Sequence, residues 1–260
     1  LTDHTPGYGS AAKYLAVTMG EIIRDTSIYA VPAVTIVEIM GRNAGWLTLA
    51  AALPRFVGGS KPDIVAIPEV PFNEEDFIQR VRDAHRRSPN VVAVVSEGLR
   101  TKDGNYVGSQ TKSGVVDIFG HTYLSGVGKY LECLVSEKIG CKVRSIELNL
   151  MQRCSSHLAS FQDLEEGFAI GKEGVAAALR GESGKMVAVK RLSNSPYAIG
   201  LETVEVTGVA NKEQLVPEKW WDLEDPRVQA EICSYILPLI KGEVPQFKNE
   251  FGLNDYVIFE

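Results

Sequence analysis

The sequence has little positive charge and no long apolar run, and each shortage excludes a class of protein. Its 260 residues carry 27 Lys and Arg against 33 Asp and Glu, a formal net charge of −6. Nucleic-acid-binding proteins usually carry a basic excess, so we expect no nucleic-acid partner. No apolar stretch approaches the roughly 18 residues of a membrane span, and the first ten residues lack the features of a signal peptide. We therefore expect a cytoplasmic protein without a membrane partner.

Paired cysteines and several common catalytic motifs are also lacking. The four cysteines form no Cys-x-x-Cys pair and stand at no zinc-site spacing from a histidine, so we expect buried, reduced thiols and no metal site. The four histidines are scattered, which suggests surface or structural roles. There is no Gly-x-x-x-x-Gly-Lys-Ser/Thr phosphate loop, no Gly-x-Ser-x-Gly elbow, and no Gly-x-Gly-x-x-Gly after a strand. These absences disfavour P-loop kinases, α/β-hydrolases and dinucleotide oxidoreductases.

Short apolar runs alternate with helical patterns along the chain. The β-branched, apolar runs predict strands buried on both faces, as in parallel sheets. The predicted strands are Val34–Met40, Asp63–Pro68, Val91–Ser96 and Val143–Leu150, with two more within residues 185–206. The predicted helices are Ala11–Asp25, a segment from Trp46 closed by Pro54, one capped by Asn73, Leu124–Ile139 and Ser160–Arg180, and residues 97–116 are predicted as a loop. This order predicts an α/β three-layer sandwich with a mostly parallel sheet.

Polar residues directly follow three of the predicted strands. They are Met40, Gly41 and Arg42 after the first, Glu69 after the second, and Gln152 and Arg153 after the strand that begins near Val143. In open α/β sheets, ligands bind beyond the carboxyl ends of the strands. Arginine binds phosphate bidentately, and a carboxylate accepts hydrogen bonds from sugar hydroxyls. The set predicts a sugar-phosphate site, although solvated loop arginines or a glycine that only ends its strand would give the same pattern.

Four segments resemble the phosphofructokinase family and follow its order. They are "TDHTPGYGSAAKYLA", "VTIVEIMGRNAGWLTLAAAL", "AIPEVPFNEEDFI" and "VRSIELNLMQRCSSHLAS", and the resemblance extends from residue 2 to about residue 219. It implies that Met40-Gly41-Arg42 lies against the sugar phosphate, that Glu69 meets the sugar, and that Gln152-Arg153 binds the phosphate. It also implies that Arg144 reaches into the site of a neighbouring subunit, so we expect a homo-oligomer.

The resemblance implies a 6-phosphofructokinase, which transfers a phosphoryl group to the 1-hydroxyl of fructose 6-phosphate in glycolysis with the help of Mg²⁺. The donor is pyrophosphate or ATP, and the residues of the first two segments are more similar to those of family members that use pyrophosphate. The family's catalytic Thr-Ile-Asp-Asn-Asp run and its Gly-rich donor-binding half would precede Leu1. We therefore expect this chain to be the sugar-phosphate-binding part of a longer protein, with no catalytic residue of its own and inactive alone.

Two departures from the family pattern concern assembly and phosphate binding. Many members have histidine where this chain has Leu150, and tetrameric members have a second intersubunit arginine in the region of Ala33. The choice between dimer and tetramer therefore stays open. We expect residues 1–216 to form the sugar-phosphate-binding part and residues 217–260 to form a C-terminal tail that packs back on it.

Two alternative functions remain beside the enzyme. The first is a non-catalytic regulatory subunit of the same family, which the intact Arg42, Glu69 and Arg153 argue against, because a regulatory copy is free to lose them. The second is a nicotinamide oxidoreductase on a doubly wound sheet, which lacks the dinucleotide fingerprint.

Overall fold

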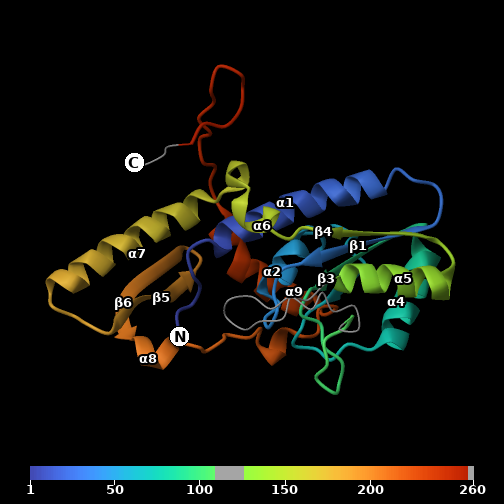
Figure 1. Ribbon diagram of the computed structural model, residues 1–260, viewed down its shortest axis with the longest axis horizontal. Helices are drawn as coiled ribbons and strands as arrows, with labels where there is room; N and C mark the ends of the chain where they lie inside the picture. The colour runs from blue at the N-terminus through green and yellow to red at the C-terminus, as the bar shows by residue number, and fades with distance from the viewer. Residues whose placement is uncertain (109–125, 257–260) are drawn as a thin grey trace.

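The computed structural model describes residues 1–108 and 126–256 of the chain. Within them, a parallel sheet has the strand order β2-β3-β1-β4. Its strands are β1 (Ala33–Ile39), β2 (Ile64–Ala66), β3 (Asn90–Ser96) and β4 (Lys142–Glu147). Val37 of β1 pairs with Val94 of β3 on one side and Ile146 of β4 on the other. The prediction of an α/β fold with a mostly parallel sheet is confirmed (Figure 1).

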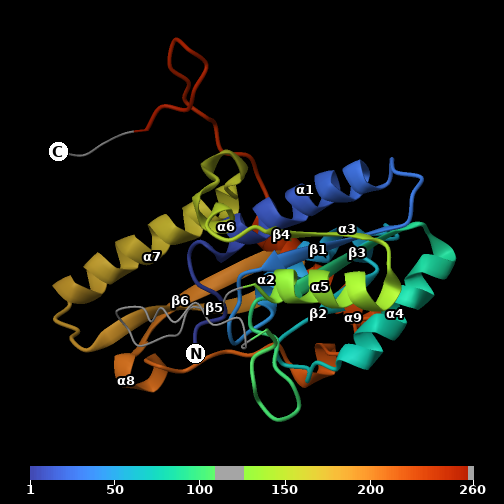
Figure 2. The same ribbon diagram turned by 45° about the vertical axis from the view of Figure 1, so that its right-hand side comes forward.

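Helices cover both faces of this sheet, which gives three layers. They are α1 (Tyr8–Thr26) on one face and α4 (Glu74–Arg87) and α5 (Val127–Ile139) on the other. Alternate strand residues point to opposite faces. Ile36 therefore packs with α4 and α5, whereas its neighbour Val37 packs with α1. Figures 1 and 2 show α1 on one side of the sheet and α4 and α5 on the other. This two-sided burial explains why the strands read as continuous apolar runs.

A further apolar cluster joins the short helices after β1 to the C-terminal part of the chain. These elements are α2 (Trp46–Ala51), α3 (Leu53–Phe56), α9 (Pro226–Ile236) and the 3-10 helices Glu218–Trp220 and Leu237–Ile240. Leu49 and Leu53 pack there with Trp220 and Ile232. The prediction that Pro54 closes a helix was wrong, because Pro54 lies in the first turn of α3, where its missing N–H is tolerated.

A helix and a hairpin extend beside the main sheet. They are α7 (Phe161–Leu179) with the antiparallel strands β5 (Lys185–Asn194) and β6 (Tyr197–Glu205). Short elements connect this unit to the rest: α6 (Met151–Cys154), the 3-10 helix Ser156–Leu158 and α8 (Val206–Val209). Asp163 on the buried face of α7 accepts hydrogen bonds from the backbone N–H groups of Gly7 and Ser10 at 2.8 and 3.1 Å. It thereby caps the start of α1.

Some predictions differ from the structure or fall outside it. The predicted loop at residues 97–116 is described only to residue 108, and the first two residues of the predicted 124–139 helix lie outside the described part. The expectation of buried cysteines was wrong for Cys133 and Cys154, which are exposed on α5 and α6, while Cys233 is buried. Within the described residues, no helix is both long and apolar enough to cross a membrane.

Candidate functional site

The turn after β1 is fixed at the carboxyl end of the sheet by the last residue of β3 and the residues that follow it. Gly41 has a φ of +145°, a conformation that favours glycine, and an added Cβ would lie 2.6 Å from the carbonyl oxygen of Ala44. The Gly41 N–H donates to Glu97 Oε1 at 3.1 Å, and Ser96 Oγ donates to the Gly41 carbonyl at 2.5 Å. Ser96 Oγ also accepts from the N–H of Gly98 at 3.1 Å. The backbone that carries Arg42 is therefore held in one conformation.

Arg42 itself is closely bordered by Gly98 along its backbone. A Cβ on Gly98 would lie 1.9 Å from the Arg42 carbonyl oxygen, so only glycine fits there. The Arg42 side chain is half-buried. In residues 1–108 and 126–256, no hydrogen bond or ion pair engages its guanidinium group. A rigid backbone with an unengaged cation is suited to binding an anion.

Gln152 connects α6 to the end of β1. Its side chain is 2% exposed. Its Oε1 atom accepts a hydrogen bond from the Met40 N–H at 3.2 Å, and its Nε2 atom donates to the Asn149 carbonyl at 3.2 Å. The next residue, Arg153, is exposed, and its guanidinium group also forms no hydrogen bond or ion pair within the described part of the chain. The Met40–Gln152 contact thus places two arginine-bearing backbone segments side by side.

Glu69 accepts hydrogen bonds from two backbone segments. The Gly45 N–H, at the start of α2, donates to its Oε1 and Oε2 atoms at 3.0 and 3.2 Å, and the Val216 N–H donates to Oε1 at 2.9 Å. Gly45 has no room for a side chain, because a Cβ would lie 2.6 Å from the Cβ of Ile67. A carboxylate has about four acceptor positions, so Glu69 fixes these two segments and keeps acceptor capacity on Oε2.

Arg144 lies away from the other predicted site residues. It pairs with Thr35 near the amino ends of the strands, whereas the other six residues follow the carboxyl ends. Its guanidinium group is 4.0 Å from Asp25 Oδ2 and lies over the ring of Tyr29 at 5.5 Å. The structure therefore joins the segments Met40–Arg42 and Gln152–Arg153 through the Met40–Gln152 hydrogen bond, and it holds Glu69 against the Gly45 N–H that precedes α2. It separates Arg144 from them.

Comparison with known sequences identifies the family. The family model described as Phosphofructokinase matches residues 1–170. The chain belongs to the phosphofructokinase family. The resemblance seen in the four sequence segments is thereby confirmed, and the matched region contains every predicted site residue.

The relatives of this phosphofructokinase chain are longer than it is. It is 35% identical over 252 residues to a protein from Halomonas elongata named pyrophosphate–fructose 6-phosphate 1-phosphotransferase, covering 96% of this chain and 59% of that protein. It is 32% identical over 84% of its length to a sulfofructose kinase from Alkalicoccus urumqiensis, of which it covers 56%. The crystal structure of a pyrophosphate-dependent phosphofructokinase from Marinobacter aquaeolei superposes with a TM-score of 0.80 at 30% identity, covering 100% of this chain and 63% of that one. The chain thus spans about three fifths of these relatives.

Sequence reasoning missed a buried carboxyl beside the site of this phosphofructokinase chain. Glu38 lies two residues before Met40 in β1, is 8% exposed and accepts a hydrogen bond from the Gly128 N–H at 2.6 Å. Burial raises the pKa of Glu38 to about 7; the Gly128 hydrogen bond opposes this rise, and the charges of Glu147 and Glu97 add to it. The sequence feature that could have pointed to this buried carboxyl was a single glutamate inside a predicted apolar strand.

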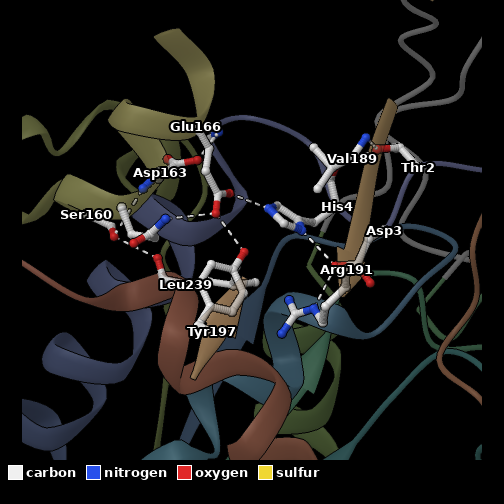
Figure 3. A network of polar contacts seen from close by, with 12 residues as sticks. Thr2, Asp3, His4, Ser160, Asp163, Glu166, Val189, Arg191, Tyr197 and Leu239 are labelled. Carbon is white, nitrogen blue, oxygen red and sulfur yellow. Dashed lines mark hydrogen bonds and ion pairs between the residues drawn. The ribbon is translucent and has the colours of Figure 1, made fainter. Parts of the chain in front are cut away.

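A second group that sequence reasoning missed is the buried polar network shown in Figure 3. The ring of His4 lies between two carboxylates, with Nδ1 2.8 Å from Asp3 Oδ2 and Nε2 2.6 Å from Glu166 Oε2. The Tyr197 hydroxyl donates to Glu166 Oε1 at 2.6 Å, and Arg191 Nε donates to Asp3 Oδ2 at 3.0 Å. The network fastens the first residues of the chain to α7 and to the β5–β6 hairpin.

The described part of the chain contains no cluster of metal-ligating side chains. Among its residues, no group of three or more His, Cys, Asp or Glu side chains is arranged to hold a metal ion. No residue of this part of the chain is therefore assigned to Mg²⁺.

Proposed function

We propose that this chain supplies the fructose 6-phosphate site of a pyrophosphate-dependent 6-phosphofructokinase. The observation that carries the proposal is the pair of guanidinium groups of Arg42 and Arg153, which have no partner in the described part of the chain and lie on segments joined by the Met40–Gln152 hydrogen bond. Two such groups match the charge of a sugar phosphate, and each guanidinium can bind phosphate bidentately. The names of the Halomonas and Marinobacter relatives support pyrophosphate as the donor, with ATP as the alternative.

In this proposal the site binds and orients the acceptor sugar. Arg42 and Arg153 bind the 6-phosphate, and the remaining acceptor capacity of Glu69 Oε2 receives a sugar hydroxyl. Gln152 positions Arg153 through its contact with Met40. Phosphoryl transfer depends mainly on such positioning and on charge stabilisation. The 1-hydroxyl is thereby presented to the donor, and the product is fructose 1,6-bisphosphate.

Other parts of the proposal concern the rest of the protein. The donor, Mg²⁺ and the catalytic base are assigned to residues that this chain does not span. Arg144, placed far from Arg42, is assigned to the site of a neighbouring subunit in a homo-oligomer. Residues 1–216 form the sugar-phosphate-binding part in this proposal, residues 217–260 pack behind it, and the protein is cytoplasmic.

Replacing Arg153 by alanine in the full-length protein that contains these residues tests the proposal. Removing a charge-assisted hydrogen-bonding group costs about 1.5–3 kcal/mol, so the KM for fructose 6-phosphate should rise by roughly 10- to 150-fold. The KM for the donor should stay nearly unchanged. Arg86→Ala is the matched control, because Arg86 is an exposed arginine of α4 paired with Asp83 at 2.7 Å. A rise in both KM values, or in neither, contradicts the assigned role.

A further inference from the structure

The turn after β1 is held on both sides of Arg42. On the side that precedes Arg42, the Gly41 N–H donates to Glu97 Oε1, and the Gly41 carbonyl accepts from Ser96 Oγ. On the side that follows it, both polar atoms of the Asn43 side-chain amide form hydrogen bonds. The contacts of Gly41 fix the backbone before Arg42, and those of Asn43 fix the next residue along the chain.

Arg100 supplies the first contact of the Asn43 amide. Its Nη2 atom donates to Asn43 Oδ1 at 2.8 Å and to the Tyr106 hydroxyl oxygen at 2.6 Å, and its Cζ atom lies 4.4 Å from the centre of the Tyr106 ring. The backbone of Arg100 is held as well, because its carbonyl accepts from the Phe72 N–H at 2.7 Å and it forms an antiparallel bridge with Tyr106. A long side chain that is already held at several points loses little further freedom when it binds Asn43.

The second contact comes from the segment Glu213–Val216, which we call the strap. Asn43 Nδ2 donates to Glu213 Oε1. In the next residue of the strap, the Gln214 carbonyl accepts from Trp46 Nε1 at 2.7 Å. The strap therefore follows the turn after β1 and holds it from the side opposite to Arg100.

We propose that Asn43 is a positioning residue for the acceptor sugar phosphate, and that it directs Arg42 because its amide is clamped between Arg100 and Glu213. This inference rests on the proposed function, in which Arg42 binds the 6-phosphate. Bidentate phosphate binding requires the guanidinium plane to meet the phosphate oxygens in one orientation. Such precision needs a second set of residues that lock the binding residue in place. Gly41 and Asn43 together provide that lock for the backbone of Arg42.

The two contacts require an amide at position 43. An amide accepts at one atom and donates at another, which suits a cation on one side and a carboxylate on the other. In Asn43→Asp, the new carboxylate still accepts from Arg100, with charge assistance. It also faces Glu213 with no hydrogen between the two groups, and their like charges repel. Glu213→Gln should remove this repulsion, because the amide that it introduces can donate to the new carboxylate.

Steady-state kinetics of the full-length protein that contains these residues tests this role, with fructose 6-phosphate and pyrophosphate varied in turn. Asn43→Asp should raise the KM for fructose 6-phosphate by roughly 5- to 20-fold, because a repulsion replaces a hydrogen bond. It should leave kcat and the KM for pyrophosphate within about twofold of the unmodified values. The double variant Asn43→Asp/Glu213→Gln should return the KM for fructose 6-phosphate to within about threefold.

Asn249→Asp is the matched control. It makes the same change of charge in the C-terminal segment, which extends away from the parallel sheet (Figure 1). The Asn249 side-chain oxygen accepts from the Phe251 and Leu253 N–H groups at 3.0 Å, and an aspartate can accept both hydrogen bonds. All four kinetic constants should therefore be unchanged in this control.

Arg42→Ala separates this inference from the proposed function. A large rise of the sugar KM in Arg42→Ala, with no rise in Asn43→Asp or a rise that Glu213→Gln does not reverse, overturns the positioning role alone. No rise in Arg42→Ala overturns the proposed function and the positioning role with it. A loss in Asn43→Asp that falls equally on kcat and on both KM values indicates a general structural role and overturns the inference as well.

Two further measurements keep the test decisive. Asn43→Ala removes both contacts without adding charge, and its sugar KM should rise while kcat stays nearly constant, if Asn43→Asp does not fold. Calorimetric titration with fructose 6-phosphate alone gives the corresponding Kd values without any donor. Equal Kd values in the unmodified protein and in the Asn43 variants overturn the inference.

Discussion

Replacing His4 by glutamine should remove a pH dependence from the stability of the fold. His4 is 8% exposed, and its two ring nitrogens lie 2.8 Å from Asp3 Oδ2 and 2.6 Å from Glu166 Oε2. Arg191 and the Tyr235 hydroxyl hydrogen-bond to Asp3, and the Tyr197 hydroxyl hydrogen-bonds to Glu166. Two neighbouring carboxylates favour the protonated form of the ring. Glutamine retains hydrogen-bonding capacity but carries no charge at any pH.

The magnitude follows from the pKa of His4. Burial alone would lower this pKa, but the hydrogen bonds and negative charges of Asp3 and Glu166 outweigh burial and raise it from 6.5 to about 9. Such a rise stabilises the folded state by about 3 kcal/mol. This stabilisation is fully present below pH 6.5, and it is lost as the pH rises from 6.5 through 9. The lowered pKa values of Asp3 and Glu166 keep both carboxylates ionised over this interval.

Urea unfolding at pH 6 and pH 9.5, followed by tryptophan fluorescence, measures the effect. The free energy of unfolding should fall by about 3 kcal/mol more in the unmodified protein than in His4→Gln. His157→Gln is the control, because His157 is exposed and should leave the pH dependence unchanged. Equal losses in the unmodified protein and in His4→Gln would show that the buried ring is not charged, and the reasoning would fail.

Two further changes probe the site itself. Glu38→Gln should stabilise the protein at pH 8. The pKa of Glu38 is raised from 4.5 to about 7, so the stability of the unmodified protein falls as the pH rises from 4.5 through 7. Thermal melts at pH 5 and 8 measure this, and a difference in melting temperature between the variant and the unmodified protein that is the same at both pH values contradicts it. Gly98→Ala should lower the melting temperature and weaken fructose 6-phosphate binding, because its Cβ would lie 1.9 Å from the Arg42 carbonyl oxygen. The control is Gly20→Ala in α1, where a Cβ meets no atom within 4 Å, and it should be neutral or stabilising by about 0.5–1 kcal/mol. Similar losses of melting temperature and of fructose 6-phosphate binding in Gly98→Ala and Gly20→Ala contradict this prediction.

The sheet was predictable because its strands are buried on both faces. The runs around Val34 and Val91 have no polar alternation, and this pattern distinguishes parallel strands from half-exposed ones. The helix after Asn73 was predictable from its cap, since the Asn73 side chain accepts a hydrogen bond from the Asp76 N–H at 2.9 Å. Helix ends were less predictable, because proline is compatible with both the end and the first turn of a helix, as at Pro54.

The site was predictable only in part. The rule that ligands bind beyond the carboxyl ends of strands selected Arg42 and Glu69, since both directly follow strands. It gave no information on contacts between distant segments, such as Glu69 with Val216 or His4 with Glu166, which are 147 and 162 residues apart. Such contacts depend on how whole elements pack.

A coupled assay of the full-length protein that contains these residues tests the central claim most directly. Fructose 6-phosphate and Mg²⁺ are supplied with pyrophosphate in one cuvette and with ATP in another, and sulfofructose replaces fructose 6-phosphate in a parallel pair. We expect turnover of fructose 6-phosphate with pyrophosphate and a large loss of that turnover at low sugar concentration in Arg153→Ala. Turnover with ATP alone contradicts the proposed donor, and preference for sulfofructose contradicts the proposed acceptor. Binding of fructose 6-phosphate without turnover by either donor, in folded and intact protein, contradicts the claim of an enzyme and favours a regulatory subunit.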